Sequence, residues 1–300
     1  MNNNTKGLLY AGFTALLWGF LAIALKISLY TLKPATVVWF RFSIAFIILL
    51  VSLSIFDKKM IKSVKALPPM VFLAALFLGL NYLGFITGLQ KTTPGTAQIF
   101  IQIGPVSLAI AGIIFFKERI TWKHFAGLLL LVLGFYLFYS QQNPGSIEDA
   151  TNLRNGVIFV MLGGLCWAGF SVLQKIMVSK HNPNHLNMVI YGFSALVLLP
   201  FVEYSKIPDL TLNDWLLLIF LGLNTLLAYG SLALALKYAE ANKISMIITL
   251  NPILTFVTMA ILEILAVSWI EYENFTYLSI LGAILALIGV SVVVLKRKKE

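Results

Sequence analysis

The sequence predicts an all-α membrane protein with ten transmembrane helices, arranged as two inverted five-helix repeats. Three observations lead to this fold class. The 300 residues are 59% hydrophobic and 11% charged, with a mean hydropathy of +0.90, whereas about a quarter of a soluble domain is charged. The apolar residues gather in runs of about 20, which is the length that crosses a bilayer as a helix. Short strings of residues also recur in the same order in both halves of the chain.

Each apolar run is predicted to be a helix, because a backbone in lipid must satisfy its own hydrogen bonds as a helix or a closed barrel. Barrel strands would alternate apolar and polar residues, and these runs do not. The breaks at Pro94 and near Glu240 each divide a stretch of over about 40 residues, which is too long for one crossing. The predicted spans are residues 7–28, 35–55, 69–90, 94–116, 122–140, 154–178, 185–203, 213–237, 242–264 and 275–295.

The basic residues of the loops predict the orientation of the chain. One side carries clusters at residues 58–65, 117–123 and 296–299. By the positive-inside rule, both termini are expected in the cytoplasm of a multi-pass protein of the inner (plasma) membrane. The net charge of +10 therefore reflects the loops and does not indicate nucleic-acid binding. The opposite side carries only Lys33, Lys91, Arg154 and Lys206.

Three matches define the internal repeat. Trp18 and Lys26 recur, eight residues apart, as Trp167 and Lys175. The string Leu78-Gly-Leu-Asn81 recurs as Leu221-Gly-Leu-Asn224, with a register shift that implies small insertions. The third match pairs Gln98, Gln102 and Pro105 with Ser245, Thr249 and Pro252.

The two repeat units cover residues 7–139 and 155–295, and each holds five predicted helices. Because five is odd, the second unit enters the membrane from the opposite side. Inverted repeats are a recurrent architecture of secondary transporters. Two inverted copies can exchange two conformations of nearly equal energy, so the repeat predicts transport by alternating access.

With these repeats, the chain resembles the drug/metabolite transporter superfamily, specifically proteins with two tandem EamA-type domains. The resemblance rests on Trp18-Gly19, on Arg41-Phe42, and on the stretch from Pro105 to Glu118-Arg119 that precedes Gly127. The second half departs from the family pattern after Pro252. Glu263 follows Pro252 at a distance two residues shorter than that from Pro105 to Glu118, and no arginine comes after it. The resemblance implies a ten-helix fold with a central substrate cavity and export of small organic solutes.

Polar and aromatic residues inside the spans are the candidates for that cavity. An arginine in a span either faces a cavity or snorkels to the headgroups, and a mid-membrane indole N–H needs a partner. A buried amide likewise needs a partner, either a substrate or another helix. The candidate cavity residues are Trp18, Arg41, Asn81, Gln98, Gln102, Trp167, Asn224, Ser245 and Thr249.

Two further pairs occupy equivalent positions of the two halves. Pro105 and Pro252 are predicted to kink their helices beside the binding region, the alternative being a static packing kink. Lys26 and Lys175 are predicted to snorkel to the membrane interface. Glu118 and Arg119 are interpreted as members of a surface ion-pair network.

The sequence favours a secondary transporter of small polar metabolites, expected to export amino acids or related compounds. The alternative is a channel or a structural membrane subunit without a transport cycle. An enzyme is not expected, since His124, His181 and His185 are assigned to loops and the spans carry no pair of acids or metal-ligand cluster.

No cofactor, metal or nucleic acid is expected, and no phosphate-binding loop is present. The expected partners are a small-molecule substrate and the lipid bilayer. The sequence leaves open whether the protein is a monomer or a homodimer. It also leaves open the substrate, the direction of transport and the coupling to protons.

Overall fold

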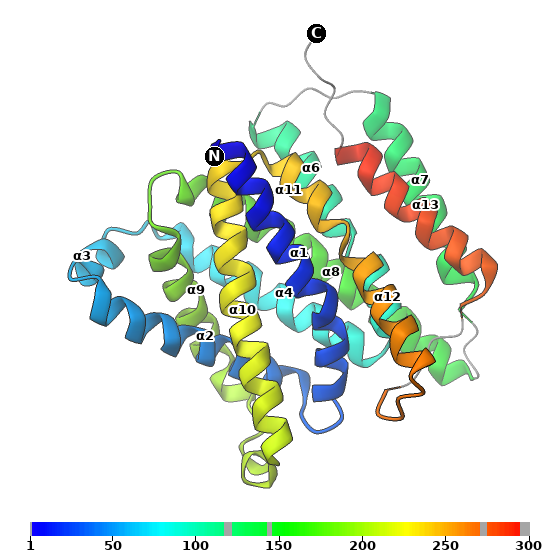
Figure 1. Cartoon of the computed structure of the whole chain (residues 1–300), viewed down its shortest axis with the longest axis horizontal. Coiled ribbons are helices and arrows are strands. Elements are labelled where there is room, and N and C mark those ends of the chain that lie inside the picture. The colour runs from blue at the N-terminus through cyan, green and yellow to red at the C-terminus, as the bar shows by residue number, and fades with distance from the viewer. Residues whose placement is uncertain (1, 117–121, 143–145, 271–274, 295–300) are drawn as a thin grey trace.

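The computed structural model describes residues 2–116, 122–142, 146–270 and 275–294, and within these ranges it is helical with no strand (Figure 1). Eight helical segments there are long and apolar enough to cross a membrane, and two shorter apolar helices bring the spans to ten. The unbroken spans are α1 (Asn3–Ser28), α2 (Pro34–Phe56), α4 (Met70–Gln90), α7 (Trp122–Ser140), α8 (Ile147–Val178), α9 (Pro183–Leu198), α10 (Leu212–Tyr238) and α13 (Tyr277–Val294).

The two spans that carry the repeat-related prolines are each broken into two helices. The first consists of α5 (Pro94–Phe100) and α6 (Ile103–Phe116), and the second of α11 (Ala241–Ile248) and α12 (Asn251–Ile264). The sequence predicts each as one span kinked at its proline; the structure breaks each span shortly before that proline. The remaining elements are short and lie between spans: α3 (Met60–Lys65), η1 (Leu199–Phe201) and η2 (Tyr204–Asp209).

Local capping explains where several helices begin. Pro34, Pro94 and Pro183 open α2, α5 and α9 in the first turn, where a missing N–H costs nothing. Ser146 accepts a hydrogen bond from the Asp149 N–H, so α8 starts in the polar stretch before residue 154, where the apolar run predicts the start of the span. Hydropathy alone does not detect a capped polar turn.

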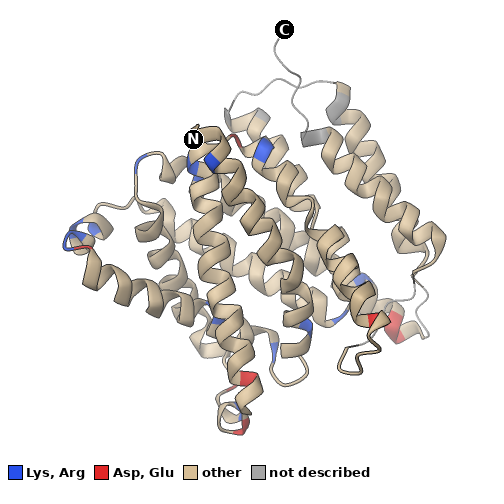
Figure 2. Cartoon of the chain, in the orientation of Figure 1, with Lys and Arg blue, Asp and Glu red and all other residues tan. Residues whose placement is uncertain are grey.

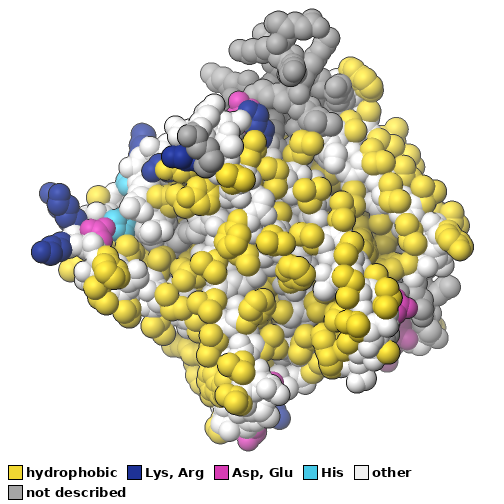
Figure 3. Space-filling model, in the orientation of Figure 1, with side chains coloured by type: hydrophobic (Ala, Val, Ile, Leu, Met, Phe, Trp, Pro, Cys, Tyr) yellow, Lys and Arg dark blue, Asp and Glu magenta, His cyan; other side chains and the backbone are white. Residues whose placement is uncertain are grey.

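Two long helix pairs form the centre of the molecule. α1 packs along α10, and α4 packs along α8 (Figure 1). α2 and α9 contact each other on one flank, and α7 and α13 lie side by side on the other. Apolar side chains cover much of the face in Figure 3, while Lys, Arg, Asp and Glu gather toward the ends of the helices (Figure 2). This distribution suits a surface in contact with lipid.

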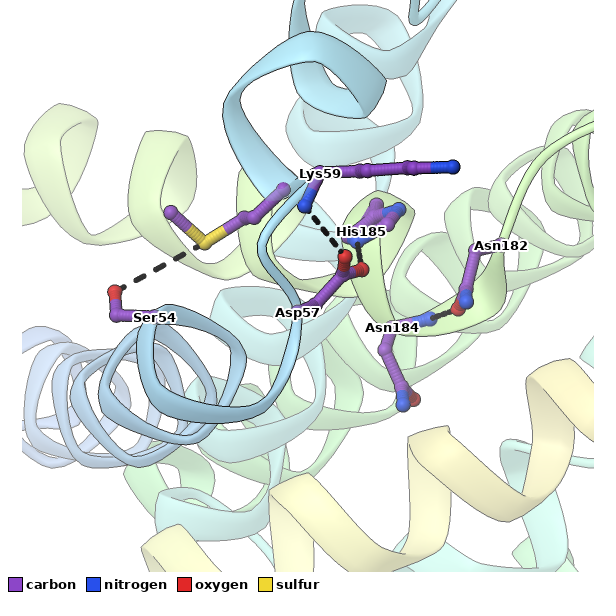
Figure 4. A network of polar contacts seen from close by, with 7 residues as sticks. Ser54, Asp57, Lys59, Asn182, Asn184 and His185 are labelled. Atoms are coloured by element: carbon purple, nitrogen blue, oxygen red, sulfur yellow. Dashed lines mark hydrogen bonds and ion pairs between the residues drawn. The ribbon is translucent and has the colours of Figure 1, made fainter.

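A polar network joins α2 of the first repeat to α9 of the second (Figure 4). The Nε2 atom of His185 lies 2.8 Å from the Asp57 carboxylate, which also accepts the Lys59 backbone N–H at 2.9 Å. The loop assignment of two histidines is therefore wrong: His185 lies in the first turn of α9, with only 4% of its surface exposed, and His124 lies in the first turn of α7. Asn182 caps α9 through the Asn184 N–H.

A central cavity between the two repeats

A cavity lies at the centre of the bundle, with a volume of about 70 Å³ open to the centre of a water molecule. Nine helices contribute its walls: α1, α2, α4, α5, α6, α8, α10, α11 and α12, with Ile101 and Gln102 at the break between α5 and α6. The lining residues are Trp18, Leu21, Arg41, Asn81, Tyr82, Phe85, Gln98, Ile101, Gln102, Pro105, Trp167, Tyr229, Ile248 and Asn251.

Aromatic residues at equivalent positions of the two halves meet in this cavity. The rings of Trp18 and Trp167 form an edge-on pair with centroids 6.0 Å apart. The rings of Tyr82 and Tyr229 lie 5.5 Å apart, and Tyr229 also lies 5.1 Å from Trp18. Such distances are typical of favourable aromatic pairs. The centre of the site is therefore built from both repeats.

Contacts between the helices set the register of the repeat. The Asn81 side-chain amide donates to the Gly163 carbonyl at 2.9 Å, and the Thr14 hydroxyl donates to the Ala228 carbonyl at 3.1 Å. The two bonds join equivalent positions, with donor and acceptor exchanged, if α8 follows α1 by 149 residues, as Trp167 follows Trp18, and α10 follows α4 by 147. That register pairs Asn81 with Ala228.

The same register pairs Tyr82 with Tyr229, and Gln98 with Ser245. The repeated Leu-Gly-Leu-Asn string is therefore displaced by one helical turn in the structure. Since 3.6 residues make a turn, a four-residue shift keeps the string on nearly the same helix face. Aligning the two strings places Tyr82 and Tyr229 at different positions, so the string match does not reveal them as a pair. A signal for the pair is nevertheless present, because Tyr82 precedes Gln98 by 16 residues and Tyr229 precedes Ser245 by the same number.

Arg41 points into the bundle and leaves only 2% of its surface exposed. Its Nε donates to the Thr225 hydroxyl at 3.1 Å, and its guanidinium carbon lies 4.2 Å from the centroid of the Tyr82 ring. One terminal nitrogen finds no hydrogen-bond partner among the described residues. Snorkelling, the alternative that the sequence left open, does not describe this side chain.

Arg41 also makes the site electrostatically asymmetric. It is the only charged residue among the described residues that line the cavity. Its counterpart in the second repeat, at the same distance from the first-turn proline of α9, is Ile190. The site therefore carries one positive charge, in a setting that is expensive unless the charge acquires a partner.

Several polar atoms of the cavity also lack a partner in the described chain. Gln98 donates to the Trp18 carbonyl at 3.2 Å, and Gln102 donates to the Gln98 carbonyl at 3.3 Å. The Gln102 side-chain oxygen and the indole N–H groups of Trp18 and Trp167 remain unsatisfied. Because buried polar groups are normally paired, these atoms indicate where a ligand or water binds.

Of the nine candidate cavity residues, Trp18, Arg41, Asn81, Gln98, Gln102 and Trp167 line this cavity. The other three are buried but do not line it. Asn224 donates to the Leu17 carbonyl at 2.9 Å, Thr249 donates to the Met246 carbonyl at 2.6 Å, and the Ser245 hydroxyl lacks a partner among the described residues. The polar residues missed from the sequence are Tyr82, Tyr229 and Asn251.

Both repeat-related prolines lie just after a helix break. Pro105 lies in the first turn of α6 and lines the cavity, whereas Pro252 lies in the first turn of α12 and does not. Each therefore stands where a proline is tolerated best. Glu118 and Arg119 lie outside the described residues.

Comparison with known proteins places this architecture in a family. A model of the "EamA-like transporter family" matches residues 5–140 and 154–295. An uncharacterized transporter of Haemophilus influenzae is 32% identical over 94% of this chain and 95% of its own length. The uncharacterized inner membrane transporter YhbE of Escherichia coli K12 is 30% identical over 95% of this chain and 89% of its own length.

One solved structure shares the fold, with a TM-score of 0.68 and 17% identity over 96% of both chains. At that identity the likeness concerns the fold alone. The two tandem family matches agree with the two-repeat architecture of ten helices. The chain belongs to the EamA-like transporter family and is a multi-pass membrane transporter.

Proposed function

We propose that this protein is a secondary transporter that exports amino acids or related small polar metabolites by alternating access. One observation carries the proposal: equivalent residues of both repeats, Trp18 with Trp167 and Tyr82 with Tyr229, meet around one central cavity. A solute that must be reached from each side of the membrane in turn is best held between the two repeats. The basic loops support cytoplasmic termini.

Alternating access needs two conformations of similar energy, and an inverted repeat supplies them. Either repeat can adopt the conformation of the other, which exchanges the open end of the cavity. The interface between the repeats contains close helix contacts through Gly84, Gly88, Gly156 and Gly163. Small residues at such interfaces let helices approach closely.

The chemistry of the cavity favours an amino acid as the substrate. The Arg41 guanidinium, together with the unpaired indole N–H groups of the same cavity, suits a carboxylate. The Gln102 oxygen and the aromatic faces suit an ammonium group. Apolar lining residues, such as Leu21 and Phe85, suit an uncharged side chain.

The second candidate function is a channel or a structural membrane subunit. A channel selects ions through a ring of repeated groups, usually built by oligomerisation. The central cavity here is built within one chain and carries a single charge rather than a ring. This observation supports a carrier that binds one solute at a time.

The test begins with a screen of L-amino acids for those that raise the melting temperature of the purified protein. The best ligand is then used in proteoliposomes. We expect uptake that saturates with concentration and is accelerated by unlabelled ligand on the other side. Flux that rises without saturation or counterflow would favour a channel, and no flux with any stabilising ligand would favour a structural subunit.

Replacing Pro105 with Ala is expected to bias the access equilibrium. Alanine supplies an N–H that can share the Ile101 carbonyl with Gly104, which donates to it at 2.9 Å, and so favours extension of α6 across the break. A preference of about 1.4 kcal/mol would change the ratio of access states about tenfold and slow transport. Distances between spin labels on each side, together with proteoliposome uptake, provide the measurement.

The same change at Pro252 should bias the opposite state, and the double variant should partly restore the ratio. Pro34→Ala is the control, because Pro34 opens α2 away from the cavity. Unchanged distances and normal transport in both single variants would show that the prolines are packing features only.

A further inference from the structure

Lys26 and Lys175 do not simply snorkel to the membrane interface. The Lys26 ammonium donates to the carbonyls of Leu89 at 3.1 Å and Thr92 at 2.6 Å, at the end of α4. The Lys175 ammonium donates to the carbonyls of Leu236 at 3.2 Å and Ala239 at 2.9 Å, at the end of α10.

These four bonds follow the register of the repeat. Lys175 follows Lys26 by 149 residues, and both carbonyl acceptors are displaced by 147, as Tyr229 is from Tyr82. Each ammonium thus binds the carboxyl end of a helix, where carbonyls lack intrahelical donors and the helix dipole favours a cation. The same device occurs twice, once in each repeat.

The two lysines lie at opposite ends of the bundle. The Thr31 hydroxyl donates to Asp214 in the first turn of α10 at 3.2 Å, which places the end of α1, and hence Lys26, near the start of α10. Lys175 instead binds the last turn of that 27-residue helix and the residue after it. The cavity lies between these ends, with Trp18 on α1 and Tyr229 on α10.

The bonds also cross between the two central helix pairs. α1 contacts α10 far more extensively than α4, and α8 contacts α4 far more extensively than α10. Lys26 therefore connects the α1–α10 pair to α4 at one end, and Lys175 connects the α4–α8 pair to α10 at the other. Between them, the Trp18–Trp167 and Tyr82–Tyr229 contacts join the pairs at the centre.

We propose that Lys26 and Lys175 are a pair of reciprocal latches, each closing one end of the cavity. Rocking of the α1–α10 pair against the α4–α8 pair breaks the bonds of one lysine and keeps those of the other. An ammonium is strongly hydrated, so water that enters at the opening end replaces the lost carbonyls. Both latches are formed in this structure.

This proposal rests on alternating access, and its test uses two label pairs in equivalent positions. Tyr30 with Gln90 reports the Lys26 end, and Ser179 with Lys237 reports the Lys175 end; all four side chains are exposed. Cys166 is the only cysteine, so Cys166→Ala supplies a clean background for labelling. Distance distributions are recorded in lipid nanodiscs by pulsed electron spin resonance.

Lys26→Met is expected to raise the fraction of long Tyr30–Gln90 distances about fivefold, the ratio typical for loss of a cation at a helix carboxyl end. The Ser179–Lys237 distance should then be mostly short. Lys175→Met should raise the fraction of long Ser179–Lys237 distances and leave the Tyr30–Gln90 distance mostly short. The double variant Lys26→Met/Lys175→Met should restore the ratio of the two open states found in the parent protein. Lys26→Arg, which keeps the charge, should give distance distributions close to those of the parent protein.

Lys33→Met is the matched control, because Lys33 is an exposed lysine that pairs with Glu203 at 3.0 Å and does not join the helix pairs. If the single variants melt earlier but shift neither distance, or shift the same one, while the parent protein shows both states, the lysines only cap helices and the latch proposal is wrong. If the parent never populates two states, with or without its best amino-acid ligand, alternating access itself fails.

Discussion

Replacing Arg41 with methionine should lower the transport efficiency, kcat/KM, for an amino acid by about 100-fold, which corresponds to about 2.7 kcal/mol. Hydrogen bonds to charged groups contribute about 1.5–3 kcal/mol each, and Arg41 is the only charge among the described residues that line the cavity. Arg41→Lys should retain part of the activity, since lysine keeps the charge but loses the contact of the guanidinium with the Tyr82 ring.

The measurement compares the amino acid with the largest thermal shift and its amide, in proteoliposomes. The parent protein should prefer the acid, and the Arg41→Met variant should lose that preference. Arg154→Met serves as the control, because Arg154 is an exposed residue of α8 far from the cavity lining. Equal transport of the acid by the parent and the Arg41→Met variant would exclude Arg41 from carboxylate binding.

Replacing Gly134 with alanine should destabilise the protein by about 2 kcal/mol, within the range for overpacked sites. An added Cβ would lie 2.3 Å from the Ala286 backbone nitrogen and 2.7 Å from the Gly282 carbonyl, so α7 and α13 must separate. Backbone atoms cannot turn away as a flexible side chain can. The pair is held by this close approach, which only small residues permit.

Gly12 provides the matched control in α1, because a Cβ added there meets nothing within 4 Å. Gly12→Ala should stabilise the helix by up to about 1 kcal/mol, since glycine is the poorer helix former. Thermal unfolding in detergent, followed by the loss of monodisperse protein, measures both variants. A Gly134→Ala protein that melts with the parent would show that the two helices adjust without cost.

The number of spans and the breaks between them follow from the sequence alone. Span length and apolar content are local properties, and the bilayer thickness converts them directly into helices. The division near Glu240 and the start of a helix at Pro94 were therefore predictable. The two tandem family matches agree with the repeat that the short strings revealed.

Only the tertiary structure decided which residues meet in the cavity. A string such as Leu-Gly-Leu-Asn marks a helix face but does not determine the turn, because a four-residue shift barely rotates the helix. The structure consequently replaces Asn224 with Tyr229 as a lining residue.

The contacts of the two lysines are a second feature that the sequence does not determine. Sequence places Lys26 and Lys175 at helix ends, where a long side chain can turn toward water or toward protein. Which way each turns depends on carbonyls more than 60 residues along the chain. Packing of the helix pairs brings those carbonyls within reach, and no local pattern of residues contains that information.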